Sequence, residues 1–189
     1  MQDAHPVGAG SELLVPDKVT DPDHENHDHM WVHSIEDIRQ LIPLPEKVNV
    51  RILTKNVGNG FCIEPQRFAQ YIDEFDSPWV GIHFDIGNHV LHSQPGEWIR
   101  ALGTRIRKLD VKDRVKGSRE MALISDGAVD WADVRNALTE VSYRGWAVVE
   151  VAGRDRERLA EVLARVNRVL GKSDGMPTDH MAGATTNIG

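Results

Sequence analysis

Apolar and polar positions along the chain repeat with two periods, one typical of strands and one typical of helices. Short apolar runs bounded by turn residues predict strands at "SELLVPDKV", "VNVRILTKN", "WVGIHFDIGN", "IRKLDVKD" and "GWAVVEVAG". Between these runs, apolar residues fall three or four positions apart, which predicts helices. The clearest helix is "RDRERLAEVLARVNRVL", in which one face carries Leu159, Val162, Leu163, Val166 and Leu170.

The other helices are predicted from their start signals. Ser34 has the character of an N-cap, with Asp37 three residues later and an apolar stripe that begins at Ile35. Further helices are predicted to begin at or directly after Pro65, Pro95 and Asp130.

The segment "TDPDHENHDHMWVH", which ends just before Ser34, is polar and rich in histidine. Asp and Asn surround the histidines, which favours a solvated loop with incidental metal affinity over a dedicated metal site. The histidines concerned are His24, His27, His29 and His33.

The regular alternation of strands and helices predicts the fold class. Five strands that alternate with helices indicate right-handed βαβ units and an α/β fold with a parallel sheet. We expect one domain over residues 1–172. The small and polar residues 173–189 are expected to form a disordered C-terminal tail.

Polar residues stand where most of these strands end. In parallel sheets the carboxyl ends of the strands meet at one edge, where active sites lie. A single acid at a strand end more often caps a helix or belongs to a loop, but several at successive ends favour a shared site. The residues at these ends are Lys55 with Asn56, Asp85 with Asn88, Asp110 with Lys112 and Asp113, and Glu150.

Three of these residues, Asp85, Asp110 and Glu150, are carboxylates that would repel one another without a cation. Oxygen donors suit hard divalent ions such as Mg²⁺ or Mn²⁺, with Co²⁺ as a further candidate. Such an ion can polarise the carbonyl and a neighbouring hydroxyl of a sugar, and a carboxylate can then move a proton from the adjacent carbon. The alternative is a salt-bridge network of these acids with Lys55, Lys112 or Arg107.

His83 and Cys62 are weaker candidates. His83 lies two residues before Asp85 and therefore on the same strand face; packing in the interior is its first interpretation and contact with substrate its second. Cys62 has no basic partner nearby in the sequence, so a role as nucleophile is not expected.

Composition narrows the function classes. The 189 residues carry 22 Lys+Arg and 29 Asp+Glu, a formal net charge of −7, which argues against binding to nucleic acid or to an anionic membrane surface. The single cysteine rules out an internal disulfide and fits a reducing compartment. No apolar run approaches the roughly 20 residues of a membrane span, and the start of the chain has no signal-peptide pattern. A cytoplasmic location is expected.

Four stretches resemble the sugar phosphate isomerase/epimerase family of the xylose isomerase-like TIM-barrel superfamily, which also contains endonuclease IV-type DNA repair enzymes. They are "SPWVGIHFDIGN", "EWIRALGTRIRKLDVKD", "GAVDWADVRNALTEVSYRGWAVVEV" and "DRERLAEVLARVNRVL". The resemblance extends from about Val7 to Leu170. It implies a (β/α) TIM-barrel type of fold, a divalent metal ion, and isomerisation or epimerisation of a small-molecule sugar or sugar phosphate.

The resemblance also implies roles for single residues. Asp85 matches the Asp of the D-x-G-N motif, Glu150 matches the final strand Glu, and Asp110 in "DVKD" stands where a His ligand is usual. These three would hold the metal, and Glu150 would also act in catalysis. Substrate oxygens would be contacted by Asn88, Lys112 and, as the weakest candidate, His83.

Two departures from the family pattern concern activity. Where relatives read "ENVWN" this chain reads "KNVGN", so Lys55 takes the position of a Glu that is both a metal ligand and a catalytic acid/base. By this position Lys55 is assigned to catalysis with Glu150, but it could also neutralise Asp85 and Glu150 instead of a metal. In addition, a full barrel has eight strands and about 250 residues. The five predicted strands align with the fourth through eighth, so we expect a partial barrel with open edges. A homo-oligomer or another partner would cover these edges, or the chain is a truncated gene product.

Two rival functions stay open from the sequence. A non-catalytic sugar-binding or interaction module is favoured by Lys55, because an ammonium group can replace a metal electrostatically. An endonuclease IV-like DNA repair enzyme is less favoured, because the net charge is −7 and the strand ends lack histidine.

Overall fold

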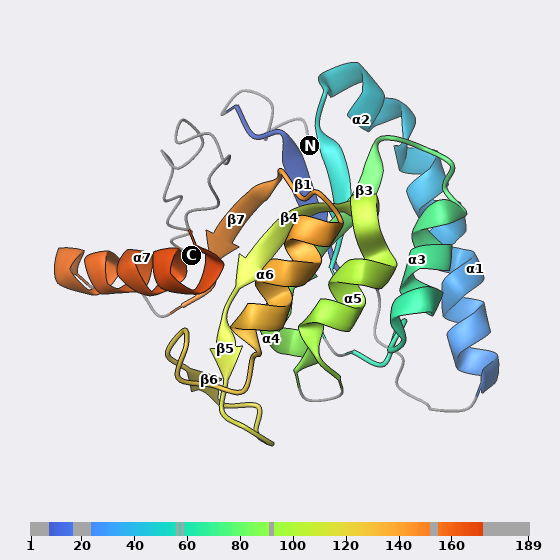
Figure 1. Ribbon diagram of the computed structural model, residues 1–189. Helices are drawn as coiled ribbons and strands as arrows, with labels where there is room; N and C mark the ends of the chain where they lie inside the picture. The colour runs from blue at the N-terminus through green and yellow to red at the C-terminus, as the bar shows by residue number, and fades with distance from the viewer. Residues whose placement is uncertain are drawn as a thin grey trace. The chain divides into compact units, whose positions relative to one another are not determined.

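The computed structural model describes residues 8–16, 24–55, 57, 59–90, 93–151 and 155–171, with side chains in the first helix from residue 27 onward. The strands are β1 (Ser11–Leu14), β2 (Arg51–Thr54), β3 (Val80–Asp85), β4 (Ile106–Val111), β5 (Asp113–Arg114), β6 (Met121–Ala122) and β7 (Trp146–Val149). The helices are α1 (His24–Leu41), α2 (Pro43–Val48), α3 (Pro65–Asp73), α4 (Ile86–His89), α5 (Pro95–Leu102), α6 (Trp131–Glu140) and α7 (Arg156–Leu170), with a 3-10 turn at Gly103–Arg105. Figure 1 labels the helices and strands.

The main sheet, within the described residues, has five parallel strands in the order β1-β2-β3-β4-β7. Leu53 of β2 pairs with Leu13 of β1 on one side and with Gly81 of β3 on the other. Helices connect successive strands, as βαβ units require. The predicted fold class, an α/β fold of the partial (β/α) TIM-barrel type, is therefore confirmed. A short antiparallel pair, β5 and β6, was not expected and lies in the loop after β4.

Burial follows position in the strand order. Every residue of β3 is buried, because a central parallel strand is covered on both faces; the sequence "VGIHFD" accordingly has no polar alternation. In β7, at one end of the order, Trp146 is 48% exposed and Val149 37% exposed.

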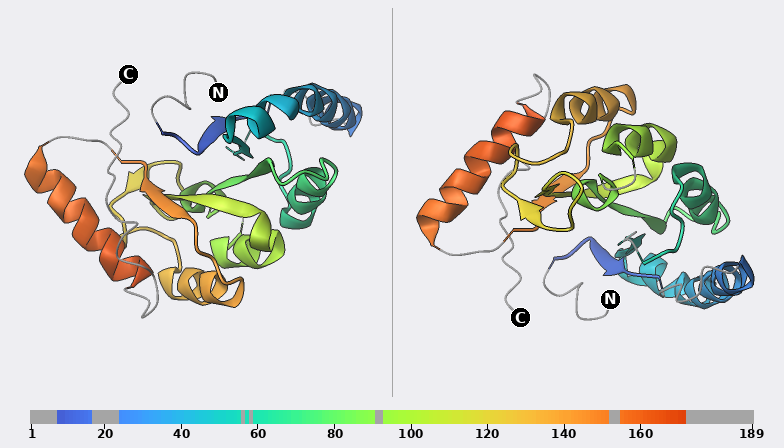
Figure 2. Two further views of the ribbon diagram at one scale, coloured as in Figure 1. Left: turned by 90° about the horizontal axis from the view of Figure 1, so that it is seen from above. Right: turned by 90° about the horizontal axis from the view of Figure 1, so that it is seen from below.

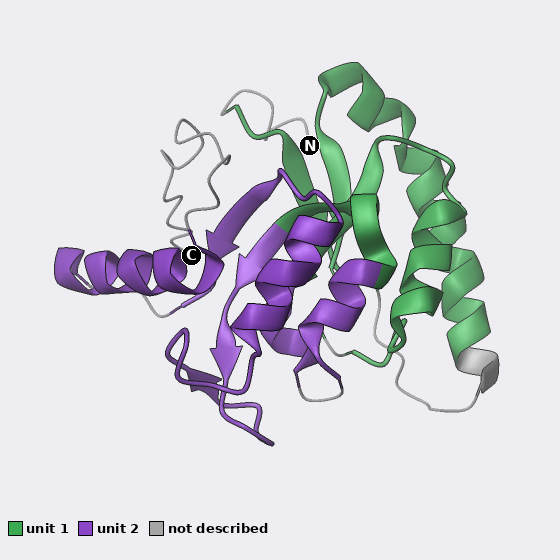
Figure 3. Ribbon diagram, viewed as in Figure 1, with its two compact units in different colours: residues 1–84, 101–108 green, residues 85–100, 109–189 purple. Residues whose placement is uncertain are grey.

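The chain divides into two compact units, shown in different colours in Figure 3. Unit 1 contains residues 1–84 and 101–108, and unit 2 contains residues 85–100 and 109–189. The boundary passes through β3 and β4, so the last residue of β3 and the second half of β4 belong to unit 2.

In unit 1, helices α1 and α3 lie side by side (Figures 1 and 2). The Trp31 ring of α1 meets the Tyr71 ring of α3 edge to face, with centroids 5.1 Å apart. The Tyr71 hydroxyl donates to Ser34 Oγ at 3.0 Å, and Ser34 Oγ donates to the Trp31 carbonyl at 3.1 Å. Phe61 packs against both aromatic rings.

This packing corrects two expectations for the histidine-rich segment. Helix α1 begins at His24, so the segment predicted as a solvated loop is mostly helical, and Ser34 lies inside the helix rather than at its N-cap. The helical stripe of Ile35 and Ile38 continues back to Trp31. The Trp31 ring supplies the contact of this part of α1 with α3. The residues around Trp31 are mostly polar, so the helical period of apolar positions does not show in the sequence.

In unit 2, charged side chains join the helices at their surface. Arg100 of α5 donates to Asp133 and Glu140 of α6, each at 2.7 Å. The hydrogen bond from Arg100 lowers the pKa of the Glu140 carboxyl, and the nearby negative charge of Asp133 only partly opposes this. Arg135 of α6 donates to the carbonyl of Val169 in α7 at 2.8 Å.

Several predictions fall on residues outside the described ranges. The tail 173–189 and the strand-end residue Asn56 are among them, so the domain limit at residue 172 stays a prediction. Across the described ranges, none of the helices combines the length and apolar character that a membrane crossing needs.

Candidate functional site

Asp85 stands at the centre of the candidate site. It ends β3 and is the N-cap of α4, where its Oδ1 accepts from the backbone N–H of Asn88 at 3.0 Å. Its Oδ2 accepts from Asn88 Nδ2 at 2.8 Å and lies 2.7 Å from the Nζ of Lys112. The side chain is 0% exposed. Asp85 is therefore both a helix cap and a member of a charged cluster, so the two sequence interpretations do not exclude each other.

Lys112 supplies the positive charge of this cluster. Its buried Nζ pairs with Asp85 and also with Glu150 Oε2 at 3.1 Å. Gly87 allows this approach, because a Cβ at that position would lie 2.6 Å from Lys112 Cγ. The ammonium group thus sits between two carboxylates, one fully buried and one whose side chain is 55% exposed.

The three predicted metal ligands come together in unit 2. Asp85, Asp110 and Glu150 each offer one carboxylate oxygen, and these oxygens all lie within 4.8 Å of one another. The first two are buried and Glu150 is exposed. Asp85 ends β3, Asp110 is the last but one residue of β4, and Glu150 follows β7, so the parallel sheet brings them to one edge.

Asn88 is held from both ends of its side-chain amide. Its Nδ2 donates to Asp85, and its Oδ1 accepts from Arg114 Nη2 at 2.7 Å. Arg114 Nε also donates to the carbonyl of Gly87 at 3.0 Å. The role of Arg114 was not found from the sequence, because Arg114 follows the last strand-end residue and looks like a loop cation.

Asp113 has a different role from Asp110, although both belong to the "DVKD" motif. The buried Asp113 carboxylate accepts from the indole N–H of Trp131 at 2.9 Å. It also accepts from the backbone N–H groups of Arg114, Ser125, Gly127 and Val129. Asp113 therefore holds the loop 114–129 together. Most of these donors are backbone N–H groups, which every residue except proline has. The sequence therefore could not indicate which residues would donate to Asp113.

Lys55 and His83 lie in unit 1, and both are buried, at 7% and 6% exposure. Lys55 follows β2, and its backbone N–H donates to the Leu14 carbonyl at 2.9 Å. The catalytic role of Lys55 and the substrate contact of His83 stay predictions.

Cys62 has the properties of a structural thiol. Its side chain is buried, and burial raises the pKa of the thiol to about 12, which the positive charge of Arg67 only partly opposes. A thiol with this pKa is protonated at neutral pH and is a poor nucleophile.

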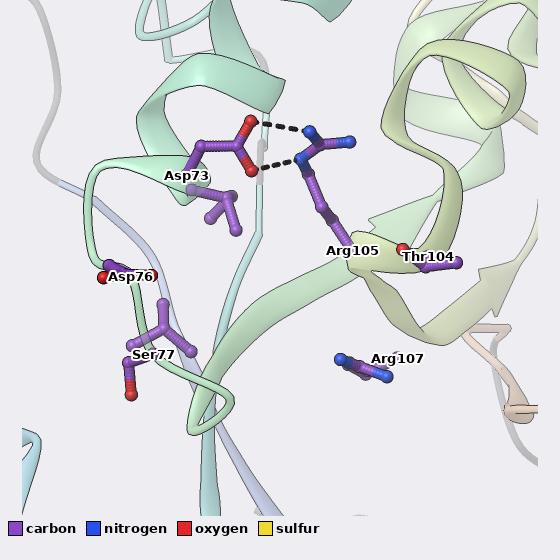
Figure 4. A pocket seen from close by; sticks show the side chains of 8 residues that line it. Asp73, Asp76, Ser77, Thr104, Arg105 and Arg107 are labelled. Atoms are coloured by element: carbon purple, nitrogen blue, oxygen red, sulfur yellow. Dashed lines mark hydrogen bonds and ion pairs between the residues drawn. The ribbon is translucent and has the colours of Figure 1, made fainter.

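A cavity of about 210 Å³ lies elsewhere, in unit 1 (Figure 4). Arg105 binds the Asp73 carboxylate there through two hydrogen bonds of 2.6 Å, which lower the pKa of the Asp73 carboxyl. Residues of this cavity precede β3 and β4, at the amino ends of the strands. In parallel barrels this end serves stability rather than catalysis.

Comparison with known proteins gives a family and a set of related structures. The family model described as "Xylose isomerase-like TIM barrel" matches residues 1–169. A curated protein of Methanocaldococcus jannaschii, described as uncharacterized, is 24% identical over 148 residues. The match covers 72% of this chain and 50% of that protein, so the chain spans about half the length of its curated relative.

Several solved structures share the fold. A D-tagatose 3-epimerase-like protein is 20% identical with a TM-score of 0.71, over 88% of this chain and 67% of that one. The IOLI protein with a zinc atom is 16% identical with a TM-score of 0.80, over 93% of this chain and 68% of that one. A xylose isomerase-like TIM-barrel protein from Mycobacterium smegmatis in complex with magnesium is 19% identical with a TM-score of 0.65, over 89% of this chain and 65% of that one.

Proposed function

The chain belongs to the xylose isomerase-like TIM-barrel family, and from this premise we propose that it is a metal-dependent isomerase or epimerase of a sugar or sugar phosphate. The observation that carries the proposal is the convergence of Asp85, Asp110 and Glu150 within 4.8 Å. Relatives of this fold include proteins described as sugar epimerases and structures with zinc or magnesium, which supports the same class of reaction.

The donor set fits a hard divalent cation. Three carboxylates offer only oxygen ligands, which suit Mg²⁺, Mn²⁺ or Co²⁺. Lys112 occupies the position of a competing cation, since its Nζ is 2.7 Å from Asp85 and 3.1 Å from Glu150. Its flexible four-carbon stem lets the ammonium move when a metal neutralises the carboxylates. The bound metal would polarise a sugar carbonyl and a neighbouring hydroxyl.

The residues of this chain then have separate tasks. Glu150 is the exposed member of the cluster and would take the proton from the carbon next to the carbonyl, which leaves an enediolate. Delivery of a proton to the neighbouring carbon then gives the isomer, and delivery to the opposite face of the same carbon gives the epimer. Lys112, once displaced from the carboxylates, would hold a substrate oxygen. Asn88 would contact a second substrate oxygen, and Lys55 would serve as the other proton-transfer group, in the place of the family's Glu. His83, buried near the end of β3, is proposed as the weakest substrate contact.

A non-catalytic sugar-binding module is the second candidate. Lys112 favours it, because the ammonium already pairs with two of the three carboxylates. In that case the chain would bind a sugar through Asn88 and Lys112 without a metal.

With either function, we propose a cytoplasmic location and a homo-oligomer that covers the open edges of the partial barrel.

Calorimetric titration of Mn²⁺ into the metal-stripped protein separates the two candidates. Asp85→Asn keeps the N-cap of α4 but removes the charge, so it should abolish Mn²⁺ binding. Asp126→Asn is the matched control, since it removes only a surface carboxylate that pairs with Arg165. Binding by the native chain and by the control, lost in Asp85→Asn, supports the enzyme. A folded native chain that binds no Mn²⁺ favours the sugar-binding module.

A further inference from the structure

Helix α1 carries two exposed histidines whose rings face each other, four residues apart. The Nε2 atoms of His29 and His33 are 3.2 Å apart. Their ring centroids are 4.3 Å apart, and the ring planes are inclined by 57°. Residues four apart on a helix lie on one face one turn apart, so the backbone itself brings these two imidazoles together.

This spacing matches the separation of two nitrogen ligands on one metal ion. With metal–nitrogen bonds of about 2.0–2.1 Å, two ligand nitrogens are about 2.9 Å apart at a right angle and about 3.3 Å apart in tetrahedral geometry. The observed 3.2 Å lies between these values. Two neutral imidazoles at this distance can share one N–H···N hydrogen bond. To bind a metal, the donor ring moves its proton to Nδ1 and each exposed ring turns so that its Nε2 lone pair points at the ion.

We propose that His29 and His33 form a binding site for a divalent transition-metal ion such as Zn²⁺, Ni²⁺ or Cu²⁺. Both side chains are exposed, so the ion can enter and keep water ligands. Glu36 and Asp37, three and four residues after His33, are exposed on the same helix face one turn further on. A carboxylate that turned toward the pair would supply an additional ligand.

The proposed site differs in chemistry from the carboxylate cluster. Imidazole nitrogen favours Cu²⁺, Ni²⁺ and Zn²⁺, whereas carboxylate oxygen favours Mg²⁺ and Mn²⁺. The two sites also use different residues, so each can fail without the other. A metal that joins two successive turns stabilises α1, because it binds the helical form and not the unfolded chain.

His27 gives a natural control on the same helix. Its ring stacks on Phe61 with centroids 5.3 Å apart and planes inclined by 16°, and its Nδ1 lies 3.6 Å from an Asp28 oxygen. It therefore belongs to the aromatic cluster of unit 1, and its removal leaves the pair His29–His33 unchanged.

The test is calorimetric titration of Ni²⁺ into the full chain and its variants. Loss of one ligand should weaken binding at least as much as loss of a supporting residue, about 10–100-fold. We expect that loss in His29→Gln and in His33→Gln, whereas His27→Gln should bind like the native chain. The exchange His33→Gln with Gln40→His keeps the composition but moves one imidazole two turns along the exposed helix face, so it should bind as weakly as His33→Gln.

Two outcomes would overturn the proposal. Unchanged Ni²⁺ affinity in both single variants would mean that the pair does not bind the metal. Full affinity in the His33–Gln40 exchange variant would mean that the number of histidines, and not their spacing, determines binding. The far-ultraviolet circular dichroism of each variant checks that the chain is folded.

Discussion

Replacement of Lys112 by methionine should lower stability and raise metal affinity at the same time. The variant leaves the fully buried Asp85 carboxylate without the ammonium that lies 2.7 Å away, while the two hydrogen bonds from Asn88 remain. It also removes the cation that competes with a metal for Asp85 and Glu150. A purely structural salt bridge would give only the first effect.

The size of the effect follows from the distance. Two unit charges 2.7 Å apart attract by about 6 kcal/mol at an effective dielectric constant of about 20. Part of this is offset by desolvation, and loss of one partner of a buried pair costs about 3–5 kcal/mol. At about 2–4 °C per kcal/mol for a chain of this size, the Tm should fall by about 6–20 °C. The exposed Glu150 adds little to this loss.

Differential scanning calorimetry with and without Mn²⁺ tests both effects. At 100 times its Kd, a ligand that binds only the folded chain adds about 2.7 kcal/mol of stability, so Mn²⁺ should recover more than half of the lost Tm. Lys116→Met, at an exposed position of the following loop, is the control and should behave like the native chain. An unchanged Tm in Lys112→Met, or a variant that Mn²⁺ stabilises less than it stabilises the native chain, would refute the reasoning.

The other predictions concern the surroundings of the site and unit 1. Asp113→Asn places an amide NH₂ group among N–H groups that now donate hydrogen bonds to the Asp113 carboxylate. The free energy of unfolding measured in urea should therefore fall by about 2–5 kcal/mol. A change below the error of the measurement would show that water replaces these contacts. Arg105 lowers the pKa of Asp73, so this pair stabilises the fold above the usual carboxyl pKa of about 4 and the contribution is lost as the pH falls through the lowered value. Tm measured between pH 2 and about 5 should therefore depend less on pH in Arg105→Gln than in the native chain, and equal profiles would contradict this. Because burial raises the pKa of Cys62 to about 12, iodoacetamide at pH 8 should alkylate the native protein much more slowly than the urea-unfolded protein; equal rates, followed by mass spectrometry, would show that the thiol is accessible.

The sequence predicted the parallel fold because the strands differ clearly from the helices. The run "VGIHFD" has no polar alternation, as expected for a central strand whose residues are all buried. The same regularity predicted that Asp85, Asp110 and Glu150 would approach one another, since each stands at the carboxyl end of a parallel strand.

The division of tasks among these polar residues could not be predicted. Asp110 and Asp113 are three positions apart in one motif, yet Asp113 accepts from the distant Trp131 and from a loop that closes over it. Lys112 was expected to contact substrate, yet its ammonium pairs with Asp85 and Glu150, and Gly87 leaves room for its stem. Such close approaches depend on tertiary packing, which local sequence does not encode.

The first part of helix α1, before Ser34, was missed for a related reason. Polar and charged residues fill the positions around Trp31, so the segment has little apolar periodicity. The contacts that fix it come from other parts of unit 1: Arg67 lies over the Trp31 ring at 4.6 Å and donates to Asp28 at 3.0 Å. The helix therefore depends on residues far away in the sequence, and its histidines acquire their geometry only after it has formed.

Transfer of a proton by the carboxylate cluster can be measured directly. The metal-stripped chain is supplied with Mn²⁺ and a panel of ketohexoses and their phosphates in D₂O, and nuclear magnetic resonance follows deuterium at the carbon next to the carbonyl. The account predicts incorporation of deuterium that requires Mn²⁺ and is lost in both Asp85→Asn and Glu150→Gln, while Asp126→Asn remains active. A folded chain that binds Mn²⁺ but exchanges no proton with any of these sugars would contradict it.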